Sequence, residues 1–147
     1  MPETPLAQLL VDQSPDAIIF AGKDGTVQLW NQAAAAMFGY SREEALGKRL
    51  DIIIPEQFRE AHWAGFDKAI STGVTKLHGE ALPTRAMKAS GENFYIEVCF
   101  ALVRDDSGAV IGALANARDI NERFQQDRSN RRRLRELEAQ VKESAAG

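Results

Sequence analysis

The chain has 147 residues, a length that suits one domain with an appended segment. No apolar run reaches the roughly 18 residues of a membrane span, and the N-terminus lacks the basic region and cleavage site of a signal peptide. The only cysteine, Cys99, excludes a disulfide framework and a cysteine-based zinc site, so we expect a cytoplasmic protein without membrane contact.

The net charge of −3 is unevenly distributed. Residues 121–143 carry seven basic and five acidic side chains, and the rest of the chain carries eleven and sixteen. An acidic body binds nucleic acid poorly, and the basic run at 131–133 has no aromatic residues interleaved for base stacking. We therefore expect a solvated helix face and no nucleic-acid partner.

The first third of the chain predicts a short helix, a hairpin and two more short helices. Leucines at helical spacing indicate a helix that ends at Ser14-Pro15. Residues 17–21 and 26–30 are of strand length and flank an Asp-Gly turn. Asn31 is placed to cap the helix that follows, and Ser41 with Glu44 fits a capping box for the next one.

The middle of the chain predicts one longer helix, from Pro55 to Gly73. Four of its side chains recur at every fourth position on one face: Phe58, His62, Phe66 and Ile70.

The last part predicts three strands in series and an exit helix. Residues 77–87, 94–103 and 110–117 read as strands joined by turns, with Pro83 as a flaw typical of a sheet edge. The segment from 120 to 143 has no glycine or proline and predicts one helix. Only four of its seven heptad positions counted from Ile120 are apolar, which indicates a broken coiled-coil seam.

This order of elements predicts an α+β fold: a five-stranded antiparallel sheet with helices on one face and a pocket between the layers. We place an N-terminal flanking helix at 1–14, the sensor domain at 15–119 and a C-terminal helix at 120–147.

Several motifs in this order resemble a PAS domain. Residues 16–48, DAIIFAGKDGTVQLWNQAAAAMFGYSREEALGK, carry the D-G hairpin, the W-N-x-A-A run and the F-G-Y-S-x-E-E-x-x-G run of that family. The closing signature is DINER, residues 119–123, and the resemblance covers about residues 6–124. It implies a non-enzymatic sensory module that forms a homodimer through its N-terminal and C-terminal helices and acts on an output domain or partner protein.

His62 is the residue whose role is open. A single histidine on an apolar helix face is usually a core residue, and a bare metal ion needs several protein ligands. Haem iron differs, because the macrocycle supplies four nitrogens and the protein only an axial one.

The segment IPEQFREAHWAGFDKAISTG resembles the helix that carries the proximal histidine in haem-binding PAS oxygen sensors. The resemblance implies haem b with His62 as the iron ligand and Phe58, Phe66 and Ile70 beside the macrocycle. Leu82 and Leu114 are then expected on the gas side, where O2, CO or NO would bind.

One position departs from that pattern. The rhizobial oxygen-sensor kinases have a gas-contacting arginine where this chain has Leu82, and Glu80 stands where a related phosphodiesterase sensor uses methionine. Arg85 or Met87 would replace the arginine only if Pro83 shifted the strand register.

Two alternatives stay open. The first is a dimerisation or interaction module without haem, whose pocket is empty or holds a metabolite. The second is a redox flavin site with FAD, suggested by Trp30 and Trp63. A light-driven flavin–cysteine adduct is not expected, because KRLDIII stands where such domains carry the reactive cysteine.

Overall fold

The fold was described from a computed structural model, which places residues 3–75 and 82–146. Within these residues, twelve elements follow one another: α1 Leu6–Gln13, β1 Ala17–Gly22, β2 Val27–Trp30, α2 Gln32–Phe38, α3 Arg42–Ala45, η1 Leu50–Ile53, η2 Glu56–Phe58, α4 Arg59–Thr72, β3 Leu82–Met87, β4 Asn93–Arg104, β5 Val110–Asp119 and α5 Asn121–Ala146. Among the described helices, none is long and apolar enough to cross a bilayer.

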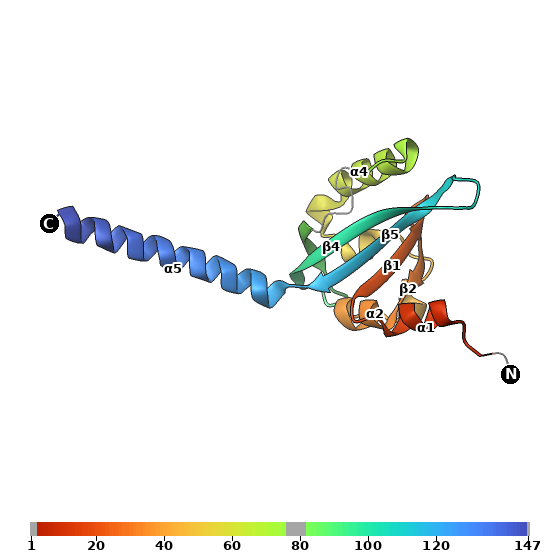
Figure 1. Cartoon of the computed structure of the whole chain (residues 1–147), viewed down its shortest axis with the longest axis horizontal. Coiled ribbons are helices and arrows are strands. Elements are labelled where there is room, and N and C mark those ends of the chain that lie inside the picture. The colour runs from red at the N-terminus through yellow and green to blue at the C-terminus, as the bar shows by residue number, and fades with distance from the viewer. Residues whose placement is uncertain (1–2, 76–81, 147) are drawn as a thin grey trace.

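The five strands form one antiparallel sheet in the spatial order β2-β1-β5-β4-β3. This confirms the predicted α+β fold with an N-terminal and a C-terminal helix. The central strands β1 and β5 pair with each other, so the first and last strands of the domain lie side by side in the middle of the sheet (Figure 1).

Local chemistry sets the first half of the fold. Gly25, with φ of 82°, closes the hairpin between β1 and β2. The Asn31 side chain accepts the Ala34 N–H at the start of α2, and Ser41 with Glu44 forms a complete capping box at α3. The predicted caps of both helices are therefore confirmed.

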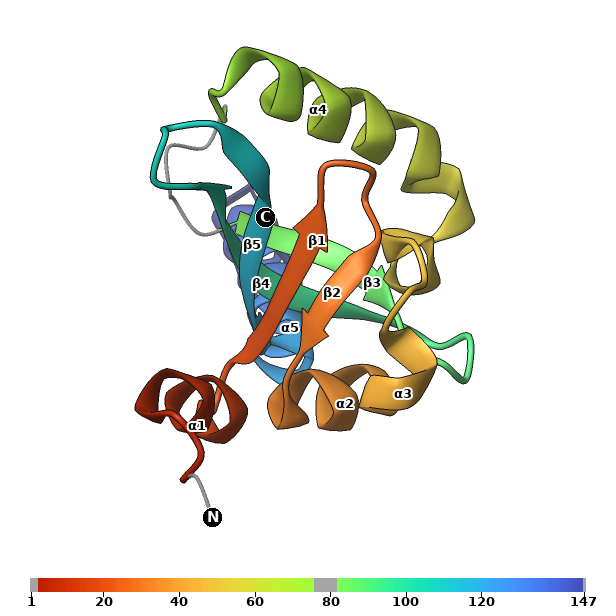
Figure 2. The ribbon, with the colours of Figure 1, turned by 90° about the vertical axis from the view of Figure 1, so that its right-hand side faces the viewer.

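One face of the sheet, the inner face, is covered by helices. Ile19 of β1 pairs with Ala115 of β5, which pairs in turn with Phe100 of β4, and these side chains pack in or against the core. Trp30 and Phe38 are fully buried beside them, with ring centroids 5.6 Å apart. Figure 2 shows α4 over one end of the sheet and α2 and α3 at the other end.

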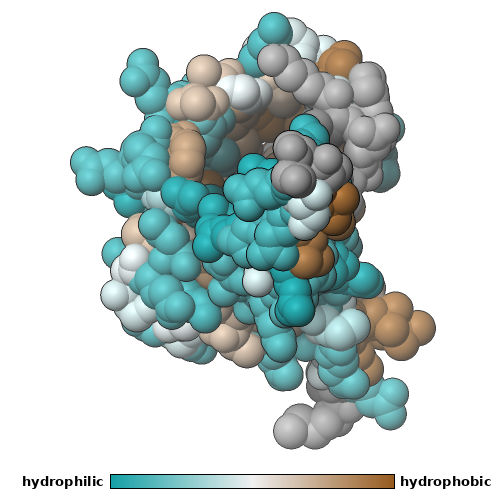
Figure 3. Space-filling view, turned by 90° about the vertical axis from the view of Figure 1, so that its left-hand side faces the viewer, coloured by the Kyte–Doolittle hydropathy of each residue, from teal (hydrophilic) through white to brown (hydrophobic). Residues whose placement is uncertain are grey.

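Helix α4 is loosely packed, because none of its side chains is fully buried. It also begins later than predicted: the segment after Pro55 first forms the 3₁₀ turn η2, and the α-helix starts at Arg59. The space-filling view in Figure 3 shows a hollow below α4, the uppermost helix, bordered in part by apolar atoms.

Candidate functional site

His62 lies in the first half of α4, half-buried among aromatic rings. Its ring centroid is 4.8 Å from that of Trp63, edge to face, and 6.1 Å from that of Phe66, with the two planes 27° apart. Trp63 and Phe66 pack against the core cluster. His62, Trp63 and Phe66 therefore form an aromatic cluster between α4 and the core.

The imidazole of His62 has an unmet requirement. Its Nδ1 atom is buried and has no hydrogen-bond partner, which is costly for a polar atom removed from water. Burial also lowers the pKa of His62 below its ordinary value of 6.5, against the opposing effect of the Asp51 carboxylate. The ring is therefore held neutral, the state in which a nitrogen lone pair is available to a ligand.

Trp63, the neighbour of His62, anchors the first half of α4. Its indole Nε1 donates to Asp51 Oδ1, and the Arg49 guanidinium lies 3.9 Å above the ring centroid. The ring edge lies so close to Gly25 that a Cβ atom there would overlap it. The start of α4 is thus tied to η1 and to the β1–β2 turn.

The sheet opposite α4 offers little bulk. At the end of the sheet near the β1–β2 turn, Ala21 of β1 pairs with Ala113 of β5, and Ala115 is the next inner-face residue of β5. Ala113 and Ala115 have small side chains and are only half-buried, so the helices do not cover them completely. A flat apolar group bound beside His62 would lie against these alanines.

The other predicted site residues of this segment differ in how deeply they are buried. Phe66 and Ile70 are half-buried on α4 with His62. Phe58 lies in η2, one turn before His62, and its side chain is 41% exposed. It borders the site and does not close it.

The expected position of Leu114 on the gas side is corrected by the strand register. Leu114 pairs with Phe20 and Ala101, and these residues alternate with the inner-face positions Ala113 and Ala115. Leu114 therefore lies on the outer face of the sheet, and the prediction that it lines the gas side is wrong. Half-buried Ala115 occupies the corresponding inner position.

Strand β3, which begins at Leu82, where the oxygen-sensor kinases have their arginine, is regular. Leu82 begins β3 opposite the buried Val98, and the pairing continues to Met87 without a bulge. Pro83 thus causes no register shift, and Arg85 and Met87 alternate with the inner-face residue Ala86. Neither replaces the missing arginine, which leaves Thr84 as the polar residue on the inner side of this strand. Glu80, like His78, lies outside the described residues.

Sequence reasoning missed the role of Trp63, Asp51 and Arg49. Trp63 had been linked only to a possible flavin, and the other two are ordinary loop residues in the sequence. The available signal was Gly25, because a glycine in a turn also permits close approach by a distant side chain.

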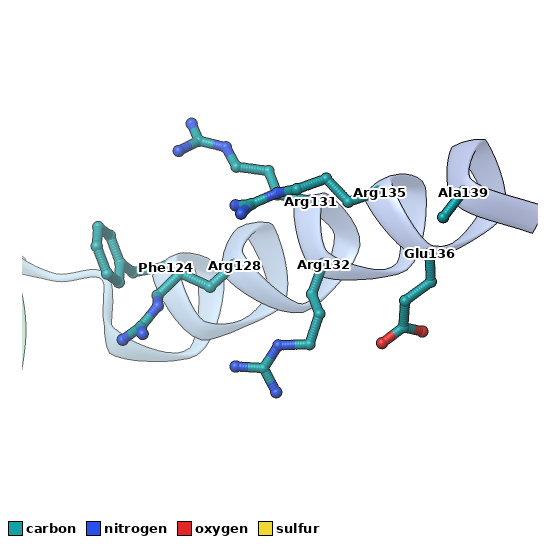
Figure 4. Close-up of a pocket in the computed structure, with 7 residues that line it drawn as sticks. All are labelled: Phe124, Arg128, Arg131, Arg132, Arg135, Glu136 and Ala139. Atoms are coloured by element: carbon teal, nitrogen blue, oxygen red, sulfur yellow. The ribbon is translucent and has the colours of Figure 1, made fainter. Parts of the chain in front are cut away.

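A second hollow runs along α5 and belongs to that helix alone. It is lined by Phe124, Arg128, Arg131, Arg132, Arg135, Glu136 and Ala139. Figure 4 shows its four arginine side chains extending from the helix, and among the described residues none of them makes an ion pair. It brings together none of the predicted site residues.

The residues around His62 meet the main requirements of a haem site. The imidazole is neutral, one of its nitrogens lacks a partner, and the opposing surface is apolar and built of small side chains. A single axial nitrogen with an apolar pocket is the donor set that haem requires.

Comparison with known proteins identifies the family. The family model described as the PAS domain matches residues 15–122. A crystal structure of the PAS domain of a protein from Colwellia psychrerythraea superposes with a TM-score of 0.69 at 22% identity and covers 79% of this chain and 95% of that one. This second match concerns the fold alone.

Three curated relatives match most of this chain. An uncharacterised protein of Azorhizobium caulinodans is 30% identical over 87% of the chain and 17% of its own length. Sensor protein FixL of Bradyrhizobium diazoefficiens is 27% identical over 86% of the chain and 24% of its own length. Oxygen sensor protein DosP of Escherichia coli is 25% identical over 82% and 15%. The chain thus spans about a quarter or less of each relative.

Proposed function

The chain belongs to the PAS domain family, and from this premise we propose that it is a sensory module that binds haem b through His62 and reports a diatomic gas or the redox state. It catalyses no reaction itself and passes its signal to an output domain or partner protein. The similarity to sensor protein FixL and oxygen sensor protein DosP supports this proposal.

The observation that carries the proposal is the buried, unpartnered Nδ1 of His62. In a side chain that serves only packing, this atom would be expected to face water or a hydrogen-bond partner. A cofactor beside the imidazole gives the ring a bonding role that offsets the cost of burying it. The neutral state of the ring favours the same role.

When bound, haem would supply an iron able to coordinate a diatomic gas. The residues of this chain would determine which gas is favoured. Ala113 and Ala115 have no side-chain hydrogen-bond donor, and Leu82 stands at the family's arginine position. Since polarised oxygen needs such a donor more than carbon monoxide does, we expect the module to hold carbon monoxide better than oxygen.

Absorbance spectroscopy tests the assignment of His62. The protein is produced with added haem precursor, and the Soret band is compared in wild type, His62→Ala and His78→Ala. We expect the band in wild type and in His78→Ala, which removes the chain's other histidine, and a lost or strongly altered band in His62→Ala. Stoichiometric haem with an unchanged spectrum in His62→Ala would refute the role of His62.

A second candidate function, a homodimeric interaction module without haem, rests on a separate observation. The two terminal helices expose large apolar side chains to solvent, including Leu6 and Leu10 on α1 and Leu134 and Val141 on α5. Such exposure is typical of surfaces that bind a partner. Colourless protein after haem reconstitution, with a dimer in light scattering that Leu6→Ser/Leu10→Ser dissociates, would favour it. Yellow protein with flavin absorbance would instead favour the FAD alternative.

A further inference from the structure

Arg85 does not reach the gas side. It lies on the outer face of β3, between Tyr95 of β4 and Phe58 of η2. Its Nη2 atom donates to the Tyr95 hydroxyl across the β3–β4 pair at 2.9 Å. Its guanidinium carbon is 5.9 Å from the ring centroid of Phe58, at the outer limit of a cation–π contact. Arg85 thus hydrogen-bonds to the outer face of β4 and lies near the turn that precedes α4.

Tyr95 in turn holds the beginning of α5. Its ring stacks on Phe124 with centroids 3.9 Å apart. Its backbone N–H donates to Asn121 Oδ1, and its carbonyl accepts the Ile120 N–H at 3.0 Å. Two contacts from the first turn of α5 and one from Ile120, the residue just before it, therefore converge on this one residue of β4.

These contacts form a continuous series from the histidine helix to the exit helix. Phe58 lies one turn before His62, Arg85 joins Phe58 to Tyr95, and Tyr95 joins Arg85 to Phe124. Each step links a different element, in the order η2, β3, β4, α5. We propose that Arg85 is a positioning residue that couples the start of α4 to the start of α5 through the Tyr95 hydroxyl.

The coupling depends on a charged side chain with two partners. If Phe58 moves, Arg85 loses one contact and the hydrogen bond that orients the Tyr95 ring under Phe124 weakens. The Arg85 hydrogen bond also lowers the pKa of Tyr95, which agrees with a charge-assisted interaction. Because the series consists of the chain's own residues, it operates whatever ligand lies below α4.

Amide hydrogen exchange of the full chain without added ligand tests this proposal, since it reports local opening of α5. Phe58→Ala should speed exchange of the amides in the first turns of α5, residues 124–128, by about fivefold or more, the lower range of a coupling between sites. The same change in an Arg85→Met background should add nothing. Ile111→Ala is the matched control: this side chain is also 41% exposed but lies on β5 away from the series, and it should leave these amides unchanged.

Tyr95→Phe gives a second, milder break in the series. It keeps the ring that stacks on Phe124 and removes only the hydroxyl that accepts from Arg85, so it too should abolish the effect of Phe58→Ala. The proposal is overturned if Phe58→Ala affects only η2 and α4. It is equally overturned if the effect on α5 persists undiminished in both the Arg85→Met and Tyr95→Phe backgrounds.

Discussion

At the scale of single residues, His62 makes stability depend on pH. Burial lowers its pKa in the folded chain, so the unfolded chain binds a proton more readily. Its contribution to stability is therefore present above the unfolded pKa of about 6.5 and is lost as the pH falls below it. In urea unfolding of the haem-free chain, we expect His62→Gln to lose less stability than wild type between pH 7.5 and 5.5. His78→Gln should behave as wild type, and parallel curves for His62→Gln and wild type would contradict the prediction.

Gly25 and Gly47 have the same backbone conformation and allow the contact with Trp63 to be tested by comparison. Both have positive φ, 82° and 83°, but a Cβ at Gly25 would overlap the Trp63 ring while a Cβ at Gly47 meets nothing within 4 Å. Gly47→Ala should cost only the backbone penalty, about 1–2 kcal/mol. Gly25→Ala should cost a further 1–3 kcal/mol or so from overpacking. Chemical denaturation measures both, and Trp63→Ala should remove the difference; equal costs in wild type would show that Trp63 does not anchor α4 there.

At the scale of elements, polar contacts attach α4 near its two ends, while Phe66 in its middle packs against the core without being fully buried. Trp63 ties the first half to η1 and the β1–β2 turn. At the other end Arg104 donates to the Gly73 carbonyl at 2.9 Å and to the Gly108 carbonyl at 3.0 Å, joining the end of α4 to the β4–β5 turn. A helix without buried side chains that is fixed at its ends is suited to admit a ligand below it.

Arg104→Met tests the second attachment. Loss of two exposed hydrogen bonds should lower global stability by only about 1 kcal/mol or less. Exchange of the Gly73 N–H, which bonds to the Ala69 carbonyl, should nevertheless rise severalfold because the last turn of α4 is freed. Arg118→Met, which breaks an exposed ion pair with Asp16, serves as the control and should leave that amide unaffected. Unchanged Gly73 exchange in Arg104→Met would count against an attachment at this end.

At the scale of the whole molecule, the order of elements could be predicted because local chemistry determines it. The Asp-Gly turn, the Asn31 cap and the Ser41 capping box each act within a few residues. Asn31 also shows where such prediction ends, since its Nδ2 donates to the carbonyls of Val11 and Asp16 and so docks α1 on the domain. Nothing local in the sequence indicates those partners.

The candidate site could be predicted only in part, for a related reason. His62, Phe66 and Ile70 share a helix face, and the 3.6-residue period places them together. The facing strands are apolar on both sides, so alternation alone does not say which of Leu114 and Ala115 is inward. The position of Arg85 depended instead on whether Pro83 shifts the register of β3, and the regular β3–β4 pairing shows that it does not.

The loose packing of α4 leads to a prediction for the whole chain. A ligand that binds only the folded state stabilises it by mass action, by about 2.7 kcal/mol at a hundredfold excess over the dissociation constant. For a domain of this size, that corresponds to a rise of very roughly 8 °C in melting temperature. We expect haem to raise the melting temperature of wild type and of His78→Ala by this order and to leave His62→Ala nearly unchanged. Because haem also adheres to apolar surfaces, the comparison between the two histidine variants decides the outcome: an equal rise in His62→Ala would place the bound haem away from the hollow below α4.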